Sequence, residues 1–375
     1  MGTSPVLDNV TSTRQFRSVD LFKIIAVQLI VLHHLAFYGP MSDQVELVAP
    51  ALIAWLDDYA RIAVQVFLVT GGFLAARSLS PSGTPGIARP WRTIGRRYLK
   101  LVPPFLVATL LTVAASALAS LWMTHASISA TPTITQLAAH ALLLHGVLGY
   151  ASVSAGAWYV AIDFQLYALM TLLLWVSGAL ATRRSVPWML PALVVLMSSL
   201  SLLVVNRDAA WDDWAPYFFG SYGLGAMAWW ARDLRRSPAT AKWLLGAILL
   251  PATIALMIDF RSRIAVAVVL ACALVLINRS NTGEAWNHHR GLNWIDQLGK
   301  RSYSVFLIHF PVCLLVNAWF SHFVPAEPLW QGLGMLTAWI SSLLAGAMFH
   351  QWIELPLSQL SRAGGRQTRT APVTR

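Results

Sequence analysis

Charged side chains are scarce in this chain. Asp, Glu, Lys and Arg together make up 11% of its 375 residues, whereas hydrophobic residues make up 57%. Soluble domains carry about 25% charged residues, so the composition excludes a water-soluble fold of this length. Strict alternation of apolar and polar residues is also missing, which excludes a transmembrane barrel. The hydrophobic residues instead form long blocks, and a bilayer requires roughly 20 consecutive apolar residues per helix. We therefore expect an all-α polytopic membrane protein.

Cysteine is equally rare. Only Cys272 and Cys313 occur, both within apolar blocks, and their number and spacing exclude a disulfide framework and a cysteine-based metal site. We expect two free thiols and no metal. The polar segment 1–13 lacks the short apolar core and cleavage site of a signal peptide. The first apolar block is therefore expected to remain in the mature protein as a membrane helix.

About ten apolar blocks are predicted to span the membrane: 19–38, 60–80, 97–123, 157–179, 187–206, 214–231, 242–259, 263–278, 302–321 and 332–353. With the N-terminus inside, only four of the 27 Lys and Arg residues lie at the outer side: Arg61, Arg207, Arg261 and Arg263. This asymmetry follows the positive-inside rule. The net charge of +11 thus indicates topology rather than nucleic-acid binding. It places both termini in the cytoplasm, with anionic lipid or an anionic cytosolic substrate as partner.

One apolar segment, 134–149, is too short for a span, and counting it as one would put the later Arg clusters outside. We interpret it as a short outer re-entrant or interfacial helix. The chain then divides into a cytoplasmic N-terminal segment (1–17), one transmembrane domain (18–356) and a basic cytoplasmic tail (357–375). We expect the tail to be disordered because it is polar and basic.

The first predicted helix carries ionisable residues, which are costly within a membrane. Lys23 and His34 are 11 positions apart, so their side chains return to nearly the same face, about 16 Å apart along the helix axis. In one interpretation, Asp20 and Lys23 are interfacial charges and the adjacent His33 and His34 are satisfied core residues. In the other, His34 is a general base that acts on an elongated anionic cosubstrate.

Two further segments carry polar residues at membrane depth or at its edge. Asp163 lies in "AGAWYVAIDFQLYALM", between Trp158 and Tyr167, and is either paired with a histidine or solvated near the interface. The segment "RPWRTIGRRYLKLVPPF" carries Arg97 and Lys100. Such a cationic cluster suits phosphate groups, but it is also typical of a cytoplasmic anchor.

Six segments, taken in order, resemble the acyltransferase family 3 membrane proteins. "RSVDLFKIIAVQLIVLHHLAF" is similar to the family's opening helix, in which a basic residue precedes the catalytic histidine by 11 positions. Lys23 replaces the usual Arg, and His34 matches that histidine. "VQVFLVTGGFLAARSL" resembles the second-helix block, with Gly71 in place of Ser. "RRYLKLVPPF" resembles the entry to the third helix, and its two basic positions are Arg97 and Lys100.

The remaining three segments lie further along the chain. "WYVAIDFQLY" matches the family's Trp, first acidic residue and Tyr with Trp158, Asp163 and Tyr167, but its second acidic position is Phe164. "LGKRSYSVFLIHFPV" resembles the late-helix signature, and "WIELP" resembles the closing segment. The matched residues in these two segments are Ser302, Tyr303, His309, Pro311 and Glu354.

The resemblance implies transfer of an acyl group, often acetyl, from cytosolic acyl-CoA to a hydroxyl of a sugar, glycan or glycolipid at the outer side of a bacterial inner membrane. His34 would be the general base or a transient acyl carrier, and Asp163 would orient it. Lys23, Arg97 and Lys100 would bind coenzyme A, and no permanently bound cofactor is implied. The residues expected to bind substrate or support the site are Asp20, Trp158, Tyr167, Ser302, Tyr303, His309 and Glu354.

The main alternative is a proton-coupled transporter or another non-catalytic membrane protein. In that case the buried His, Asp and Lys residues would relay protons or bind a solute. The polar residues cluster on a few helices, and no inverted repeat of the kind common in transporters is visible in the sequence. Both features favour the acyltransferase.

Overall fold

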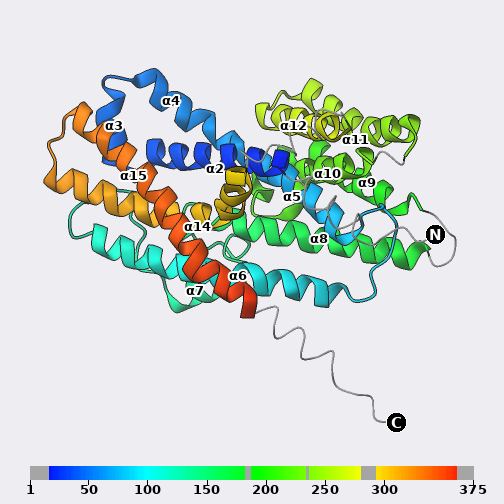
Figure 1. Ribbon diagram of the computed structural model, residues 1–375, viewed down its shortest axis with the longest axis horizontal. Coiled ribbons are helices and arrows are strands. Elements are labelled where there is room, and N and C mark those ends of the chain that lie inside the picture. Colours follow the sequence, from blue (N-terminus) through cyan, green and yellow to red (C-terminus); the bar gives the residue numbers. More distant parts are fainter. Residues whose placement is uncertain (1–16, 182–186, 234–235, 280–292, 361–375) are drawn as a thin grey trace, which may run out of the picture. The chain divides into compact units, whose positions relative to one another are not determined.

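The computed structural model describes residues 17–181, 187–233, 236–279 and 293–360. These residues form helices joined by turns and loops, and no strand occurs among them (Figure 1). The main helices are α2 (Arg17–Phe37), α3 (Pro40–Glu46), α4 (Pro50–Asp58), α5 (Val64–Leu79), α6 (Pro90–Ala119), α7 (Ile134–Ala141), α8 (Ala157–Ala181), α9 (Met189–Leu203), α10 (Ala215–Ala231), α11 (Pro238–Ile258), α12 (Ser262–Arg279), α14 (Asn293–Phe323) and α15 (Pro328–Phe349). Short 3-10 turns lie at Ala60–Ala63, Val205–Arg207 and Ala209–Trp211, and a π-helix lies at His350–Glu354.

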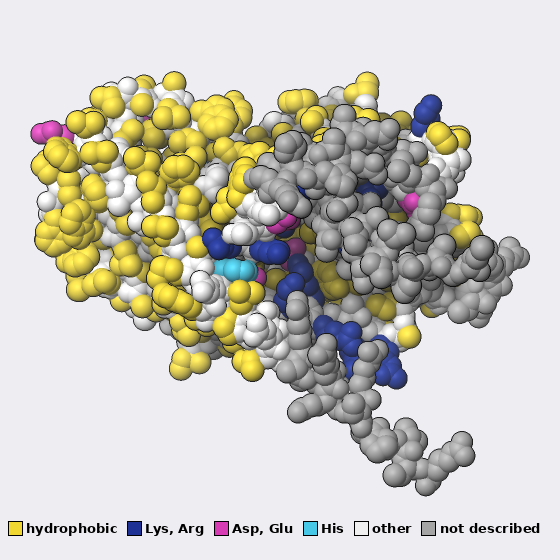
Figure 2. All heavy atoms as spheres, in the orientation of Figure 1, with side chains coloured by type: hydrophobic (Ala, Val, Ile, Leu, Met, Phe, Trp, Pro, Cys, Tyr) yellow, Lys and Arg dark blue, Asp and Glu magenta, His cyan; other side chains and the backbone are white. Residues whose placement is uncertain are grey.

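The prediction of an all-α polytopic membrane protein is confirmed. In the described part of the chain, eight helical stretches are long and apolar enough to cross a membrane. They are Arg17–Phe37, Pro50–Leu79, Pro90–Ala119, Ala157–Ala181, Met189–Arg207, Pro238–Ile258, Asn293–Phe323 and Pro328–Leu360. The two other predicted spans are also helical, as α10 and α12, but the apolar part of α12 is shorter, at Ser262–Ile277. Hydrophobic side chains make up much of the described surface in Figure 2, as expected for contact with lipid.

The segment 134–149 contains only the eight-residue helix α7. Thr133 caps this helix, because its hydroxyl accepts a hydrogen bond from the backbone N–H of Gln136. A helix of this length extends about 12 Å, well short of the roughly 30 Å hydrocarbon core. The segment is therefore a short non-spanning helix, as predicted. Residues 1–16 and 361–375, where the N-terminal segment and most of the tail were predicted, lie outside the described residues. Residues 357–360 are helical rather than disordered.

The chain divides into two compact units. Unit 1 comprises Met1–Ala26, Ile62–Pro90 and Gln165–Lys300, and unit 2 comprises Val27–Arg61, Trp91–Phe164 and Arg301–Arg375. Helices α2, α8 and α14 each contribute residues to both units. The predicted domain 18–356 includes nearly all of the described residues of both.

The core of unit 1 is built around α10, in which every residue except Pro216 is buried. Its backbone packs directly against α5: a Cβ atom on Gly72 would meet the carbonyl oxygen of Tyr222, and one on Gly225 would meet that of Val69. Small residues at such crossings allow the close helix contacts that stabilise membrane proteins, where burial from water contributes little. A buried hydrogen bond from Ser221 to Gln65 adds a polar contact between the same two helices.

Unit 2 is organised around the C-terminal part of α14. Its buried residues Phe310 and Leu314 pack with Ala119 and Met123 at the end of α6 and just after it. Asn317, one turn further along α14, donates hydrogen bonds to the carbonyls of Tyr38 and Cys313. This packing holds α14 next to α2 and α6 and so positions the polar residues described below. Cys272 and Cys313 are both free, as predicted.

Candidate functional site

Two histidines from distant parts of the sequence meet in unit 2. His34 on α2 and His309 on α14 are joined by a hydrogen bond of 2.7 Å between His34 Nδ1 and His309 Nε2. Their rings are nearly parallel, at an interplanar angle of 5°, and the two residues are 8% and 0% exposed. We call them the histidine pair.

The hydrogen-bond order within this pair fixes which nitrogen is basic. His309 Nδ1 lies 2.7 Å from the carbonyl oxygen of Phe306, one helical turn earlier. A carbonyl only accepts, so Nδ1 of His309 carries the proton and its Nε2 is a lone-pair acceptor. His34 must then donate from Nδ1, which leaves the lone pair on His34 Nε2. That atom has no hydrogen-bond partner among the residues that the structure describes.

The neighbouring His33 is held differently. Its Nδ1 lies 3.1 Å from the carbonyl oxygen of Leu56 at the end of α4, and Asp57 is 3.9 Å away. Successive residues of a helix are rotated by about 100°, so His33 contacts α4 while His34 contacts α14. The separation of the two histidines that the helix geometry predicted is therefore present, and His33 is satisfied by backbone.

Asp163 contacts Arg97 rather than His34. Its Oδ2 pairs with Nη2 of Arg97 on α6, and these side chains are 13% and 28% exposed. The expected contact between Asp163 and His34 is therefore not present, and His34 instead forms its hydrogen bond with His309. A largely buried carboxylate requires a charged partner to offset its desolvation, and a neutral imidazole supplies none. Lys100 lies three residues after Arg97 on α6 and is exposed.

The other residues proposed from the late segments link helices within unit 2. The Tyr303 hydroxyl donates to the carbonyl of Leu101 on α6 at 3.1 Å, and Ser302 is buried. Glu354 accepts a hydrogen bond from Ser304 and lies 2.9 Å from His350. These last two contacts lie at the π-helix, a form that recurs at functional sites. Trp158 is half-buried at the start of α8.

In unit 1, Asp20 and Lys23 pair with each other at 2.8 Å on α2. A Cβ atom on Gly299 would lie 2.5 Å from the Asp20 side chain, so the glycine allows the start of α14 to approach this pair. Arg17 on α2 contacts Asp296 on α14 at 3.4 Å and forms an ion pair between these two helices. Tyr167 is half-buried on α8. The pairing favours a structural role for Asp20 and reduces the charge that Lys23 presents.

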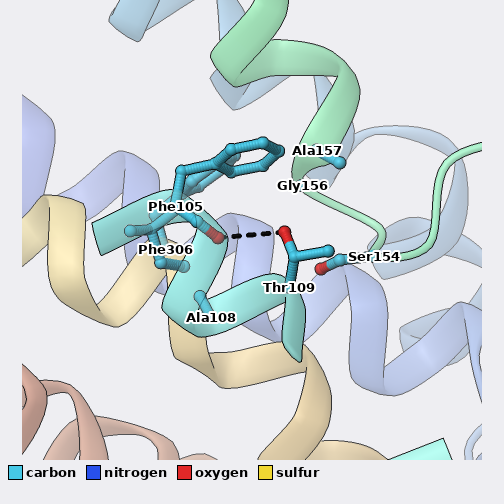
Figure 3. A pocket seen from close by; sticks show the side chains of 8 residues that line it. Phe105, Ala108, Thr109, Ser154, Gly156, Ala157 and Phe306 are labelled. Atoms are coloured by element: carbon cyan, nitrogen blue, oxygen red, sulfur yellow. Dashed lines mark hydrogen bonds between the residues drawn. The ribbon is translucent and has the colours of Figure 1, made fainter. Parts of the chain in front are cut away.

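A small pocket lies within unit 2 (Figure 3). Its cavity volume is about 10 Å³, which is room for about one water molecule. Its lining comes from α6, from the loop before α8 and from α14, and includes Phe105, Thr109, Ser154, Gly156, Phe306 and Leu307. Sequence reasoning missed this pocket because none of its residues is charged. The only signal was the glycine in "AGAWYV".

A second pair of stacked histidines lies in the segment 134–149. His140 is fixed by the backbone, since its Nδ1 donates to the Gln136 carbonyl and its Nε2 accepts from the N–H of Val153. His145 stacks on it at 4.1 Å between ring centroids, and neither ring nitrogen of His145 has a partner among the described residues. Burial lowers the pKa of both residues, and that of His145 falls to about 4.

Metal chemistry receives no support from the described residues, in which no group of three or more His, Cys, Asp or Glu side chains is placed to hold a metal ion. A family model described as an acyltransferase domain matches residues 16–350. The match includes His34, Arg97, Asp163 and His309 and ends before Glu354. No curated protein and no solved structure matches the chain.

Proposed function

Because this chain belongs to acyltransferase family 3 and is a membrane acyltransferase, we propose that it transfers an acyl group, typically acetyl, from acyl-CoA to a hydroxyl of a sugar or glycan. The histidine pair carries this proposal. It supplies a basic nitrogen, His34 Nε2, whose lone pair accepts no hydrogen bond from any described residue. General-base catalysis of acyl transfer requires such an atom.

In the proposed reaction, His34 Nε2 removes the proton of the acceptor hydroxyl while the hydroxyl oxygen attacks the thioester carbonyl carbon. The carbon–sulfur bond then breaks, and the coenzyme A thiolate takes the proton from His34. The products are an ester and free coenzyme A. His34 Nε2 is also the atom that would bear the acyl group if the transfer passed through an acyl-histidine. In either route, His34 Nδ1 keeps its proton and its hydrogen bond to His309.

His309 is proposed to hold His34 in the required tautomer, the role that a carboxylate has in a hydrolase triad. The Phe306 carbonyl orients His309, and His309 in turn orients His34. A neutral imidazole stabilises the positive charge on His34 less than a carboxylate does. It also avoids burying a second ion in a unit where both rings are almost fully buried, which would carry a large desolvation cost.

The phosphates of acyl-CoA are assigned to Arg97 and Lys100. Arginine binds phosphate through paired hydrogen bonds, and lysine binds it as a point charge. The ion pair with Asp163 fixes the position of Arg97 but offsets part of its charge, so we give the exposed Lys100 the largest share of the binding. Lys23 is paired with Asp20, so we give it a smaller share of the binding.

The distribution of Lys and Arg supports a location in the bacterial inner membrane, with both termini in the cytoplasm and the acceptor at the outer side. Single cysteines in a chain without Cys272 and Cys313 test this topology. Thr131→Cys and Asp212→Cys should react with an impermeant maleimide in intact cells, whereas Ser82→Cys and Ser237→Cys should react only after permeabilisation. All four positions are exposed in the structure. Labelling at Ser237→Cys in intact cells would reverse the orientation.

The experiment that tests the activity uses the purified full-length protein in detergent. Radiolabelled acetyl-CoA is supplied with a glycolipid and glycan extract of the cell envelope, and both coenzyme A release and labelled product are measured. We expect both signals from the wild-type protein and neither from His34→Ala. A transporter would give neither signal from either protein.

A further inference from the structure

His350 and Glu354 form a hydrogen-bonded dyad that directly follows α15. Nδ1 of His350 lies 2.9 Å from Oε2 of Glu354, and the two side chains are 13% and 18% exposed. The same carboxylate oxygen accepts a hydrogen bond from the hydroxyl of Ser304 on α14, a fully buried residue. Because a carboxylate only accepts hydrogen bonds, Nδ1 of His350 is the donor. We call His350 and Glu354 the His–Glu dyad.

The second ring nitrogen of His350 is available to a ligand. Nε2 has no hydrogen-bond partner among the described residues, and these residues do not bury it. The bond at Nδ1 fixes the direction of Nε2, as a carboxylate does for the histidine of a hydrolase triad. A structural link between α14 and α15 requires only Ser304 and Glu354, so it does not account for the histidine.

Close packing of α15 against α14 holds the dyad in place. A Cβ atom on Gly346, one turn before His350, would lie 2.7 Å from the Cα atom of Val305, so only a glycine permits this approach. Val305 follows Ser304, and the contact therefore brings Ser304 within hydrogen-bond distance of Glu354. The segment from His350 to Glu354 is a π-helix, a rare form that is frequent at functional sites.

The dyad lies near the cationic residues of α6 within unit 2. Tyr303, on α14, donates its hydroxyl proton to the carbonyl of Leu101 at 3.1 Å, and Lys100 directly precedes Leu101. The charges of Glu354 and Arg97 both act on the Tyr303 hydroxyl. The dyad, Arg97 and Lys100 are therefore grouped around one side chain of α14.

The length of α15 places the dyad at an edge of the membrane. This helix has 22 residues and extends about 33 Å, slightly more than the roughly 30 Å of a hydrocarbon core. His350 directly follows it. In the proposed topology α15 begins at the outer side, so His350 lies at the cytoplasmic edge, where a water-soluble donor arrives.

A phosphate group is the ligand that fits such a nitrogen. Imidazole Nε2 accepts a hydrogen bond when neutral and donates one when protonated. A phosphate monoester has a second pKa of about 6, close to the roughly 6.5 of an ordinary imidazole, so one proton can join the two groups from either side. The nearby Lys100, which is exposed, favours an anion over a neutral ligand.

We propose that His350 binds a phosphate group of the acyl-CoA donor through Nε2, and that Glu354 and Ser304 position it. The inference rests on the proposed function, because it takes acyl-CoA as the donor. It goes further by assigning donor recognition to the segment after α15, at the point where the family match ends. Anionic lipids also carry phosphate, and the test separates the two sources.

The test measures the Kd of coenzyme A by calorimetry on purified full-length protein in phospholipid-free detergent. His350→Asn keeps an amide that reaches Glu354 in place of Nδ1 but has no atom at the position of Nε2. We expect its Kd to rise at least tenfold, as for the loss of a hydrogen bond to a charged group. His350→Gln has an amide nitrogen near the position of Nε2 and should recover part of the affinity. Gln351→Ala, an exposed neighbour, is the matched control and should bind normally.

Kinetics separate donor binding from chemistry and from folding. For His350→Asn, KM for acetyl-CoA should rise with the Kd while kcat is retained. S-acetylpantetheine has the same thioester but no phosphate, so its kcat/KM should match that of the wild type. Glu354→Gln keeps the shape of the positioning side chain, and we expect a severalfold rise in KM for acetyl-CoA only. Thermal unfolding verifies that each variant is folded.

Three results would overturn the assignment. An equal loss of rate with acetyl-CoA and S-acetylpantetheine would place His350 in the chemical step or in the fold. An unchanged Kd of coenzyme A would exclude the donor, and a smaller stabilisation of His350→Asn than of the wild type by added phosphatidylglycerol would then identify a lipid site. The proposed function survives both of these results. If the wild-type protein neither binds coenzyme A nor releases it from acetyl-CoA, the proposed function fails together with the inference.

Discussion

Unit 2 contains two stacked histidine pairs that differ in their hydrogen bonds. In the pair of His34 and His309, a hydrogen bond of 2.7 Å joins the rings, whose centroids are 5.0 Å apart. In the pair of His140 and His145, the rings lie face to face at 4.1 Å, and the backbone uses both nitrogens of His140. All four rings are buried. Burial therefore does not distinguish the two pairs, whereas the direction of the hydrogen bonds does.

The difference also explains which pair suits chemistry. His34 donates a hydrogen bond to His309, and His309 donates one to the backbone carbonyl of Phe306. This arrangement leaves one oriented lone pair on His34. The ring nitrogens of His145 have no partner among the described residues, so none of these residues selects its tautomer or stabilises its charged form. We therefore expect activity to depend on the first pair and the pH dependence of stability to include the second.

The largest expected effect is that of His34→Ala, which removes the proposed general base. Acyl transfer should fall by about 10²–10⁴-fold, measured as labelled product at matched amounts of folded protein. The control is His33→Tyr, which should retain activity because His33 contacts α4 and not the histidine pair. If His33 proved essential and His34 dispensable, the catalytic side of α2 would be the one that contacts α4, and the assignment to His34 would be wrong.

A smaller loss is expected for His309→Phe, which keeps a ring beside His34 but removes the acceptor for its Nδ1 proton. Hydrogen-bond partners that orient metal-ligating histidines typically contribute about 10–100-fold. We expect a loss of similar size here, in kcat, while KM for acyl-CoA stays the same. His322→Phe, an exposed position near the end of α14, is the matched control. An equal change in KM and none in kcat would assign His309 to donor binding instead.

Asp163→Asn and Arg97→Ala should act on donor binding. A charged hydrogen bond contributes about 1.5–3 kcal/mol, so Arg97→Ala should raise KM for acetyl-CoA about tenfold, with a smaller effect for Asp163→Asn. The wild-type KM should itself rise with salt, because ions screen phosphate contacts. Arg96→Ala, an exposed neighbour, is the control. If Asp163→Asn lowered kcat and left KM unchanged, Asp163 would act in the catalytic step rather than in donor binding.

The smallest effect concerns the stability of the second pair. Burial lowers the pKa of His145 to about 4, below the roughly 6.5 of an unfolded chain, so the folded state binds fewer protons between these values. The contribution of His145 to the free energy of unfolding is then fully present above about pH 6.5. It decreases as the pH falls towards 4, by about 2 kcal/mol at pH 5. Thermal unfolding in detergent should show that His145→Phe loses less stability on acidification than the wild type. Equal losses would mean that His145 is not buried as a neutral ring.

Much of the candidate site was accessible from the sequence. Ionisable residues are rare in apolar helices, so His34, Asp163 and Arg97 stood out, and helical rotation separated His34 from His33. The hydrogen-bond partner of His34 could not be predicted from the sequence. His309 was proposed only for substrate binding or support, because its distance from His34 along the chain, 275 positions, gives no local signal. Asp163 was assigned to the wrong partner for the same reason, since Arg97 lies 66 positions away.

The sequence by itself determined the membrane class, the positions of the helices, the family and the residues with reactive side chains. Hydropathy and helical periodicity are local properties, and they require only about 20 neighbouring residues to be read. The tertiary structure decided which polar groups pair, which nitrogen of His34 is basic, and that Gly156 and Phe306 enclose a pocket. These features depend on how closely helices distant in the sequence pack, and that is set by small residues and side-chain shapes at their crossings.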